Sequence, residues 1–137
     1  MLAPWLTARA HHSGPNWGLG IGATVALIDA PGDLLSDLPD SVVVKRRASG
    51  RAQVVVAFFT SSVRLDRRID QLGSMIFPSG ALWVAWPKRS SGQASDLTDN
   101  IVREVSLRRG LVDNKVCSID PTWSALRLVW RRQLRST

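Results

Sequence analysis

The feature that most constrains the fold of this chain is a set of short segments that are apolar on both faces. Val54 to Phe59 and Ala81 to Trp86 are apolar throughout, and Thr24 to Asp29 holds a continuous apolar run that ends at a turn. Strands that are hydrophobic on both faces belong to the interior of parallel sheets covered by helices. The sequence therefore predicts an α/β fold with these segments as inner strands.

Helical periods separate the predicted strands. Between Ser62 and Ile76 the apolar residues recur at i, i+4, i+7 and i+11, which predicts an amphipathic helix lying on the sheet. The stripe consists of Leu65, Ile69, Leu72 and Ile76. A second helix with the apolar face Leu97, Ile101 and Val105 is expected to be capped by Asp96 or Thr98 and to end at Gly110. Asp33 to Leu38 predicts only a short helix.

The end of the chain predicts an antiparallel hairpin. The segments Lys115 to Ile119 and Ala125 to Arg131 are separated by five residues, too few for a parallel crossover. With Ser41 to Lys45 as a further strand, we expect a three-layer Rossmann-like sheet of about six strands, mostly parallel, with helices on both faces. The strand Ser41 to Lys45 is a candidate edge strand, and pairing there would give a homodimer.

The length of 137 residues predicts a single domain. We expect an irregular arm over residues 1–22, the α/β domain over residues 23–132 and a basic tail over residues 133–137. No apolar run approaches the roughly 20 residues needed to cross a bilayer, and Met1 to Ala10 has no signal-peptide pattern. Together with a single cysteine, these features predict a cytoplasmic protein.

The predicted element order is similar to the core of class I S-adenosylmethionine-dependent methyltransferases, truncated by at least one strand with its helices. A closer resemblance, to the bacterial domain of unknown function family 3052, is carried by short stretches of sequence. These are Val25 to Leu27 with Ala30 and Pro31, Gly80 to Lys88, Asp96 to Thr98, Gly110 to Cys117 and Thr122 to Arg127. That family is small and has no assigned activity, so the resemblance implies a fold and leaves the function open.

The methyltransferase resemblance implies a cofactor site that this chain matches only in part. It requires an acidic residue and glycines after the first strand, and this chain keeps only fragments of that group, with Asp29, Gly32 and Asp33 as candidates to stand in for it. It also requires an acidic residue at the end of the second strand to hold the ribose hydroxyls. Lys45, Arg46 and Arg47 stand there instead and suit a phosphorylated ligand better. S-adenosylmethionine therefore stays only as an alternative cofactor.

Ligands of open α/β sheets bind beyond the carboxyl ends of the strands, where the strand order reverses. This rule selects ligand-binding candidates, and Lys45, Arg46 and Arg47 are added as anion-binding candidates. The ligand-binding candidates are Asp29, Pro31, Gly32, Thr60, Ser61, Trp86, Lys88, Asp120 and Trp123. Three of them have a structural alternative, because Ser61 can cap the following helix and the two tryptophans can belong to the core.

Other motifs predict no chemistry. The glycines of Gly18 to Gly22 precede a strand, whereas a phosphate-binding loop follows one. His11 and His12 are adjacent, so they point in different directions and form a poor metal site. Cys117 is expected to be a buried thiol. No acid, base and nucleophile can be named together, and neither a metal site nor a catalytic residue is expected.

The formal net charge of +7 invites a nucleic-acid partner, although the basic residues are scattered along the chain. The preferred hypothesis is a non-catalytic module that binds a small anionic ligand or another protein. The alternatives are a minimal enzyme acting on a phosphorylated or nucleotide substrate and a basic nucleic-acid-binding protein.

Overall fold

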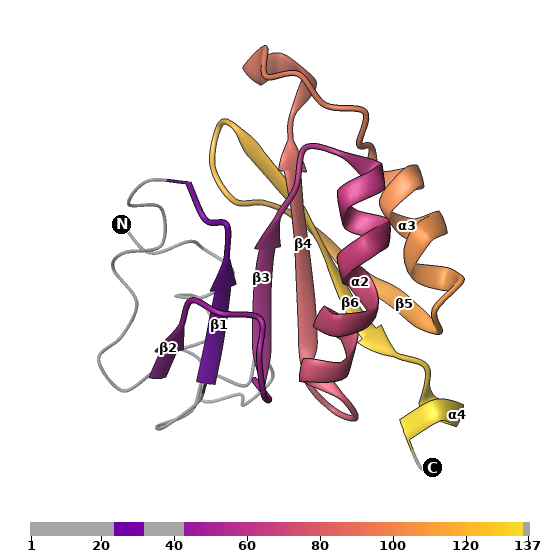
Figure 1. The fold of residues 1–137 in the computed structure, drawn as a ribbon. Coiled ribbons are helices and arrows are strands. Elements are labelled where there is room, and N and C mark those ends of the chain that lie inside the picture. Colours follow the sequence, from indigo (N-terminus) through magenta and orange to yellow (C-terminus); the bar gives the residue numbers. More distant parts are fainter. Residues whose placement is uncertain (1–23, 32–42, 136–137) are drawn as a thin grey trace.

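The computed structural model describes residues 24–31 and 43–135, which form one mixed sheet with helices packed on it (Figure 1). The six strands are β1 (Thr24–Ile28), β2 (Val43–Lys45), β3 (Val54–Phe58), β4 (Ala81–Pro87), β5 (Leu111–Ser118) and β6 (Trp123–Trp130). The helices are α2 (Ser62–Ile76), α3 (Asp99–Leu107) and α4 (Arg132–Arg135), with a 3-10 turn, η1, at Arg89–Ser91. The predicted α/β class is confirmed.

The strand order is β2-β1-β3-β4-β6-β5. β1 pairs in parallel with β2 and β3, and β3 pairs in parallel with β4. β6 is antiparallel to both of its neighbours, β4 and β5, which confirms the predicted terminal hairpin. Five strands therefore end at one edge of the sheet, here called the carboxyl edge, and begin at the opposite one, the amino edge. β2 is an edge strand of the described sheet, as predicted for Ser41 to Lys45.

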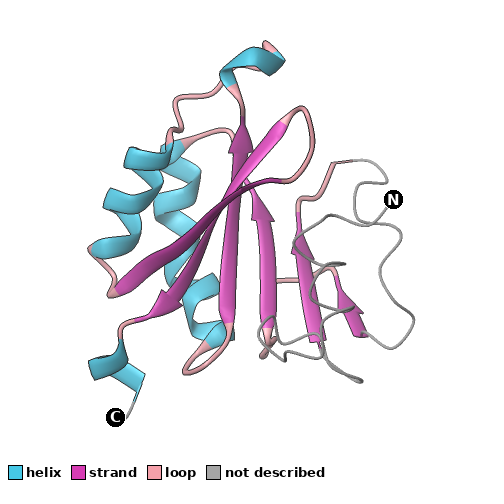
Figure 2. Ribbon diagram, turned by 180° about the vertical axis from the view of Figure 1, so that it is seen from behind, coloured by secondary structure: helices cyan, strands magenta, loops and turns pink. Residues whose placement is uncertain are grey.

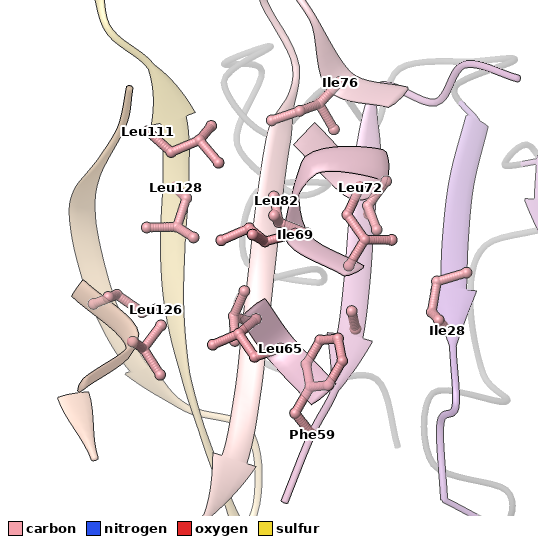
Figure 3. Packing of buried hydrophobic residues seen from close by; sticks show 14 of the residues in the cluster. Ile28, Phe59, Leu65, Ile69, Leu72, Ile76, Leu82, Leu111, Leu126 and Leu128 are labelled. Carbon is pink, nitrogen blue, oxygen red and sulfur yellow. The ribbon is translucent and has the colours of Figure 1, made fainter. Parts of the chain in front are cut away.

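Helices α2 and α3 cover the same face of the sheet. The predicted stripe of α2 is buried there against β3, β4 and β6, as Figure 3 shows for Leu65, Ile69 and Leu72. In α3 the fully buried residue is Val102, whereas Ile101, which the sequence assigned to the apolar face, is only partly buried. Figure 2 shows the sheet from the other side, where Val56 and Trp83 belong to a second buried cluster.

Some predicted segments near the ends of the chain and beside the sheet lie partly or wholly outside the described residues. The short helix expected over Asp33 to Leu38 and the irregular arm of residues 1–22 lie outside the described residues, and the described helices α2 and α3 account for one helical layer. The predicted basic tail begins inside α4 (Arg132–Arg135). None of the described helices is long and apolar enough to cross a membrane.

The terminal hairpin is longer than the sequence predicted. β5 begins at Leu111 rather than Lys115, because Leu111 and Val112 pair with Trp130 and Val129 of β6. The polar residue Asp113 interrupted the apolar pattern and hid this extension. A register shift between Asp113 and Lys115 accommodates the interruption.

Candidate functional site

A cavity of about 330 Å³ opens at the carboxyl edge, where the chain leaves β1 and β3. It lies at the point where the strand order reverses, which is where ligands bind in open α/β sheets. It is called here the carboxyl-edge cavity. Its lining residues are Asp29, Pro31, Phe58, Phe59, Thr60, Arg64, Gln93 and Trp123. The structure thus brings together four of the predicted ligand-binding residues: Asp29, Pro31, Thr60 and Trp123.

Asp29 follows β1 directly and has a left-handed backbone, with φ of 57°. Few residues other than glycine adopt this conformation, and such strained positions gather at ligand sites. One carboxylate oxygen, Oδ2, lies 3.2 Å from Nη1 of Arg68 on α2. The negative charge of Asp29 is therefore compensated by a side chain of the protein.

Two aromatic rings form an apolar wall of the cavity. Phe58 ends β3 and Trp123 begins β6, and their ring centroids lie 5.1 Å apart with the ring planes at 87°. Edge-to-face contacts of this kind stabilise aromatic pairs. Both predicted tryptophans are buried in the core. Trp86 lies beneath α2 and α3 and does not line the cavity, whereas Trp123 belongs to the cluster on the other face and also lines the cavity.

Arg64 supplies the cavity with a cation that the sequence reasoning missed. It lies in the first turn of α2, one helical turn before Arg68, so both side chains project from the same side of the helix. Within the part of the chain that the structure describes, its guanidinium has no carboxylate partner. The signal was available, because the first turn of a helix that follows a parallel strand lies at the carboxyl edge.

The amino end of α2 is occupied by groups of the protein itself. The hydroxyl of Ser61 accepts a hydrogen bond from the backbone N–H of Arg64 at 3.4 Å, so Ser61 caps the helix. The carboxylate of Asp96 accepts from the backbone N–H of Ser62 at 2.8 Å and from its hydroxyl at 2.5 Å. Thr98, not Asp96, caps α3. The position where helices usually bind anions is therefore filled by Asp96.

This arrangement gives the stability of the protein a pH dependence. Hydrogen bonds from the hydroxyl and the backbone of Ser62 hold the pKa of the Asp96 carboxyl below its usual value. The stabilisation is present above the unfolded-state pKa of about 3.9 and is lost as the pH falls through the lower pKa of the folded state. We expect Asp96→Ala to unfold at lower urea concentration than wild type at pH 7, with the difference shrinking below about pH 4.

Urea titrations of both proteins from neutral to acidic pH measure this effect. Ser62→Ala serves as a partial control, since it removes the hydroxyl donor and keeps the backbone N–H. A difference between Asp96→Ala and wild type that stays constant down to the acid limit would contradict this role of Asp96.

Lys88 and Asp120 lie outside the cavity lining and contact the β5–β6 turn. Nζ of Lys88 donates to the hydroxyl of Ser118 at 2.5 Å. Oδ1 of Asp120 accepts from the backbone N–H groups of Thr122 and Trp123, both at 2.8 Å. Asp120 therefore acts on the cavity indirectly, by fixing the turn that presents Trp123.

The basic cluster at the end of β2 also lies outside the cavity lining. The ammonium of Lys45 donates to the backbone oxygen of Ser49 at 2.6 Å and to that of Arg51 at 3.4 Å, so it holds the loop that follows β2. Arg46 and Arg47 are exposed and next in the chain.

Among the described residues, the geometry at the ends of β1 and β2 does not fit S-adenosylmethionine. The methyltransferase resemblance implies a carboxylate at the end of β2 that holds the ribose. In the structure the ammonium of Lys45, hydrogen-bonded to backbone oxygens of the following loop, lies there. The carboxylate of Asp29 is present but paired with Arg68. Gly32 and Asp33 lie outside the described residues.

No metal or thiol chemistry is supported among the described residues. They contain no cluster of three metal-ligating side chains. Cys117, which the sequence predicted to be buried, is only partly buried. Its burial raises the pKa of the thiol to about 11, which favours the protonated thiol at neutral pH. His11, His12 and the glycines of Gly18 to Gly22 lie outside the described residues.

Comparison with known proteins places the fold. No family model and no curated protein sequence matches the chain. Among solved structures, magnesium protoporphyrin IX methyltransferase from Synechocystis PCC 6803 with bound SAH superposes with a TM-score of 0.58 at 10% identity, over 92% of this chain and 78% of that one. The fold is that of the class I methyltransferases.

Two further methyltransferase-fold structures agree. An O-methyltransferase from neocarzinostatin biosynthesis gives a TM-score of 0.59 at 11% identity, over 90% of this chain and 52% of the other. The ribosomal protein L11 methylase from Lactobacillus delbrueckii subsp. bulgaricus gives 0.54 at 11% identity, over 93% and 76%. At such low sequence identities these comparisons show the methyltransferase fold, and they do not show an activity. The closer resemblance to family 3052 stays a prediction.

Proposed function

We propose that this protein is a non-catalytic module that binds a small phosphorylated molecule in the carboxyl-edge cavity. The observation that carries the proposal is the charge balance of the lining. Arg64 faces the cavity without a carboxylate partner among the described residues, whereas the carboxylate of Asp29 is paired with Arg68 at 3.2 Å. The lining itself holds one cation and one anion, and Arg68, which contacts Asp29 from outside the lining, leaves one positive charge in excess.

The rest of the lining suits a small polar ligand with an apolar portion. Thr60 and Gln93 provide a hydroxyl and an amide, and the Phe58–Trp123 pair provides an apolar wall. The volume of about 330 Å³ lies at the lower end of the range for small-molecule sites. A guanidinium binds phosphate through charged hydrogen bonds, which are stronger than neutral ones.

The absence of a catalytic set in the described lining favours binding over turnover. Asp29 is the only carboxylate there, and it is ion-paired. Thr60 has no histidine, cysteine or free carboxylate beside it among the lining residues. The alternative, a minimal enzyme acting on a phosphorylated substrate, would use the same cavity and is distinguished by product formation during incubation with the ligand.

Thermal unfolding with ligand panels tests the proposal. We expect inorganic phosphate, glycerol phosphate or AMP at millimolar concentration to raise the Tm, because a ligand that binds only the folded state stabilises it by about 2.7 kcal/mol at a hundredfold excess over Kd. Adenosine is the uncharged match of AMP and is expected to raise the Tm less. S-adenosylmethionine and S-adenosylhomocysteine are expected to leave it unchanged.

The matched variants are Arg64→Gln and Arg67→Gln. Both lie on α2, but Arg67 lines a separate hollow between α2 and α3. A lost charged hydrogen bond is worth about 1.5–3 kcal/mol, so Arg64→Gln is expected to raise the Kd about tenfold to a hundredfold, with Arg67→Gln close to wild type. No Tm response to any of the three phosphates, or equal loss in both variants, would reject the proposal.

A further inference from the structure

Positive charge gathers at the amino edge, opposite the carboxyl-edge cavity. Four connections meet there: residues 50–53 before β3, 77–80 before β4, 108–110 before β5, and 131–135 after β6 (Figure 1). They carry six arginines and no aspartate or glutamate. These arginines are Arg51, Arg108, Arg109, Arg131, Arg132 and Arg135, and they are called here the amino-edge arginines.

Direct contacts join three of these connections into one surface. Nη1 of Arg51 donates to the backbone oxygen of Phe77 at 2.8 Å. The ring of Phe77 meets that of Trp130 edge to face, with centroids 5.6 Å apart. Nε of Arg135 donates to the backbone oxygen of Trp130 at 2.8 Å. Arg51 and Arg135 are therefore held beside the partly exposed ring pair of Phe77 and Trp130.

The fourth connection joins the same surface through a backbone hydrogen bond. The N–H of Arg131 donates to the carbonyl oxygen of Gly110 at 2.9 Å, which places the turn after α3 beside the start of α4. Residues far apart in the sequence thus form one basic edge, and the scattered appearance of the arginines along the chain is resolved by the fold.

Two of the six amino-edge arginines form ion pairs with α2, and four do not. Arg109 pairs with Asp66 at 2.8 Å and with Asp70 at 3.3 Å, and Arg108 lies 3.9 Å from Asp66. The remaining four arginines have no ion pair with any residue that the structure describes. The surface therefore keeps most of its positive charge for an outside partner.

We infer that the amino edge binds the phosphodiester backbone of a nucleic acid. The four arginines without an ion pair among the described residues, Arg51, Arg131, Arg132 and Arg135, carry planar guanidinium groups, which match phosphate oxygens better than lysine does. They come from the connections at the ends of β3 and β6, which lie two strand spacings of about 4.8 Å apart, or roughly 10 Å. That width exceeds one phosphate group and fits successive phosphates along a strand or duplex.

A membrane surface fits this edge less well. Helices that lie in a membrane interface need a long apolar face beneath their basic residues. α4 has four residues, of which only Leu134 is apolar. The aromatic rings of Phe77 and Trp130 are partly buried against each other and therefore offer little apolar surface for insertion.

Fluorescence anisotropy with labelled oligonucleotides at increasing salt tests the inference, with single-stranded DNA, single-stranded RNA and duplex DNA as separate arms. We expect the logarithm of the association constant to fall linearly with the logarithm of salt concentration for at least one arm. Arg131→Gln with Arg132→Gln is expected to make the slope shallower by about 0.9 per arginine on duplex, or about 0.7 on single strands.

The double variant Arg46→Gln with Arg47→Gln is the matched control. It removes two adjacent arginines and the same charge, beyond the carboxyl end of β2, and is expected to leave the slope close to that of wild type. Circular dichroism and the Tm of both double variants show that they fold.

Three results would overturn the inference: no oligonucleotide binding at low salt, the same loss of slope in both double variants, or binding to vesicles containing phosphatidylserine with none to nucleic acid. Arg64→Gln is expected to keep wild-type nucleic-acid binding. A failure at the amino edge is thus distinguished from a failure of the carboxyl-edge cavity.

Discussion

Replacing Leu72 with alanine is expected to lower the free energy of unfolding by about 2–5 kcal/mol. Leu72 is fully buried in the cluster that joins α2 to the sheet (Figure 3). Its loss removes apolar contacts and leaves a cavity that the surrounding strands fill only in part. Because domains are stable by only about 5–15 kcal/mol, this single change is expected to remove a large share of the total.

Urea unfolding followed by circular dichroism measures the Leu72→Ala effect, and Val63→Ala is the control on the same helix. Val63 is 56% exposed, so its truncation is expected to change stability by less than about 0.5 kcal/mol. Similar losses in the two variants would mean that α2 does not pack through its predicted stripe.

The second large effect is expected at Gly80, between α2 and β4. A Cβ atom there would lie 2.6 Å from the backbone oxygen of Gln53 and 2.9 Å from that of Ile76. Neither atom can rotate away, because the backbone N–H of Gly80 donates to Ile76 and that of Ala81 donates to Gln53. Gly80→Ala therefore forces the backbone apart, and we expect a loss of about 3 kcal/mol, at the upper end of overpacking costs.

Thermal and urea unfolding of Gly80→Ala are compared with Ser79→Ala, an exposed neighbour in the same turn. Ser79→Ala is expected to stay within about 0.5 kcal/mol of wild type. A Gly80→Ala protein as stable as wild type would contradict the close approach of Gln53 and Ile76 to Gly80.

The inner strands and the stripe of α2 were predictable from the sequence because their signals are local. Val54–Phe58 is apolar on both faces, and Leu65, Ile69 and Leu72 repeat at the period of a helix. The antiparallel hairpin followed from the length of its connection alone. The start of β5 was missed because Asp113 breaks the apolar pattern, and its pairing with Arg103 at 3.0 Å is a tertiary contact.

The candidate site was only partly predictable, since position at a strand end does not fix where a side chain points. Asp29, Thr60 and Trp123 were selected by that rule and line the cavity. Lys88 and Asp120 were selected by the same rule and hydrogen-bond within the β5–β6 turn instead. Their local sequences do not distinguish the two outcomes.

Capping illustrates the same limit. Asp96 and Thr98 carry equivalent signals for the start of α3, and both are typical capping residues. In the structure Thr98 caps α3. Asp96 instead accepts hydrogen bonds from Ser62 at the start of α2, at a sequence separation of 34 residues. The amino-edge arginines were likewise unpredictable, because they lie on three connections that are far apart in the sequence.

The most direct measurement of the central claim is an NMR titration of the labelled protein with AMP. We expect saturable shifts of the backbone amides of Thr60 and Trp123, which Arg64→Gln weakens and Arg67→Gln retains. Shifts confined to the amino edge, around Arg51 and Arg132, or no shifts in the carboxyl-edge cavity, would contradict it.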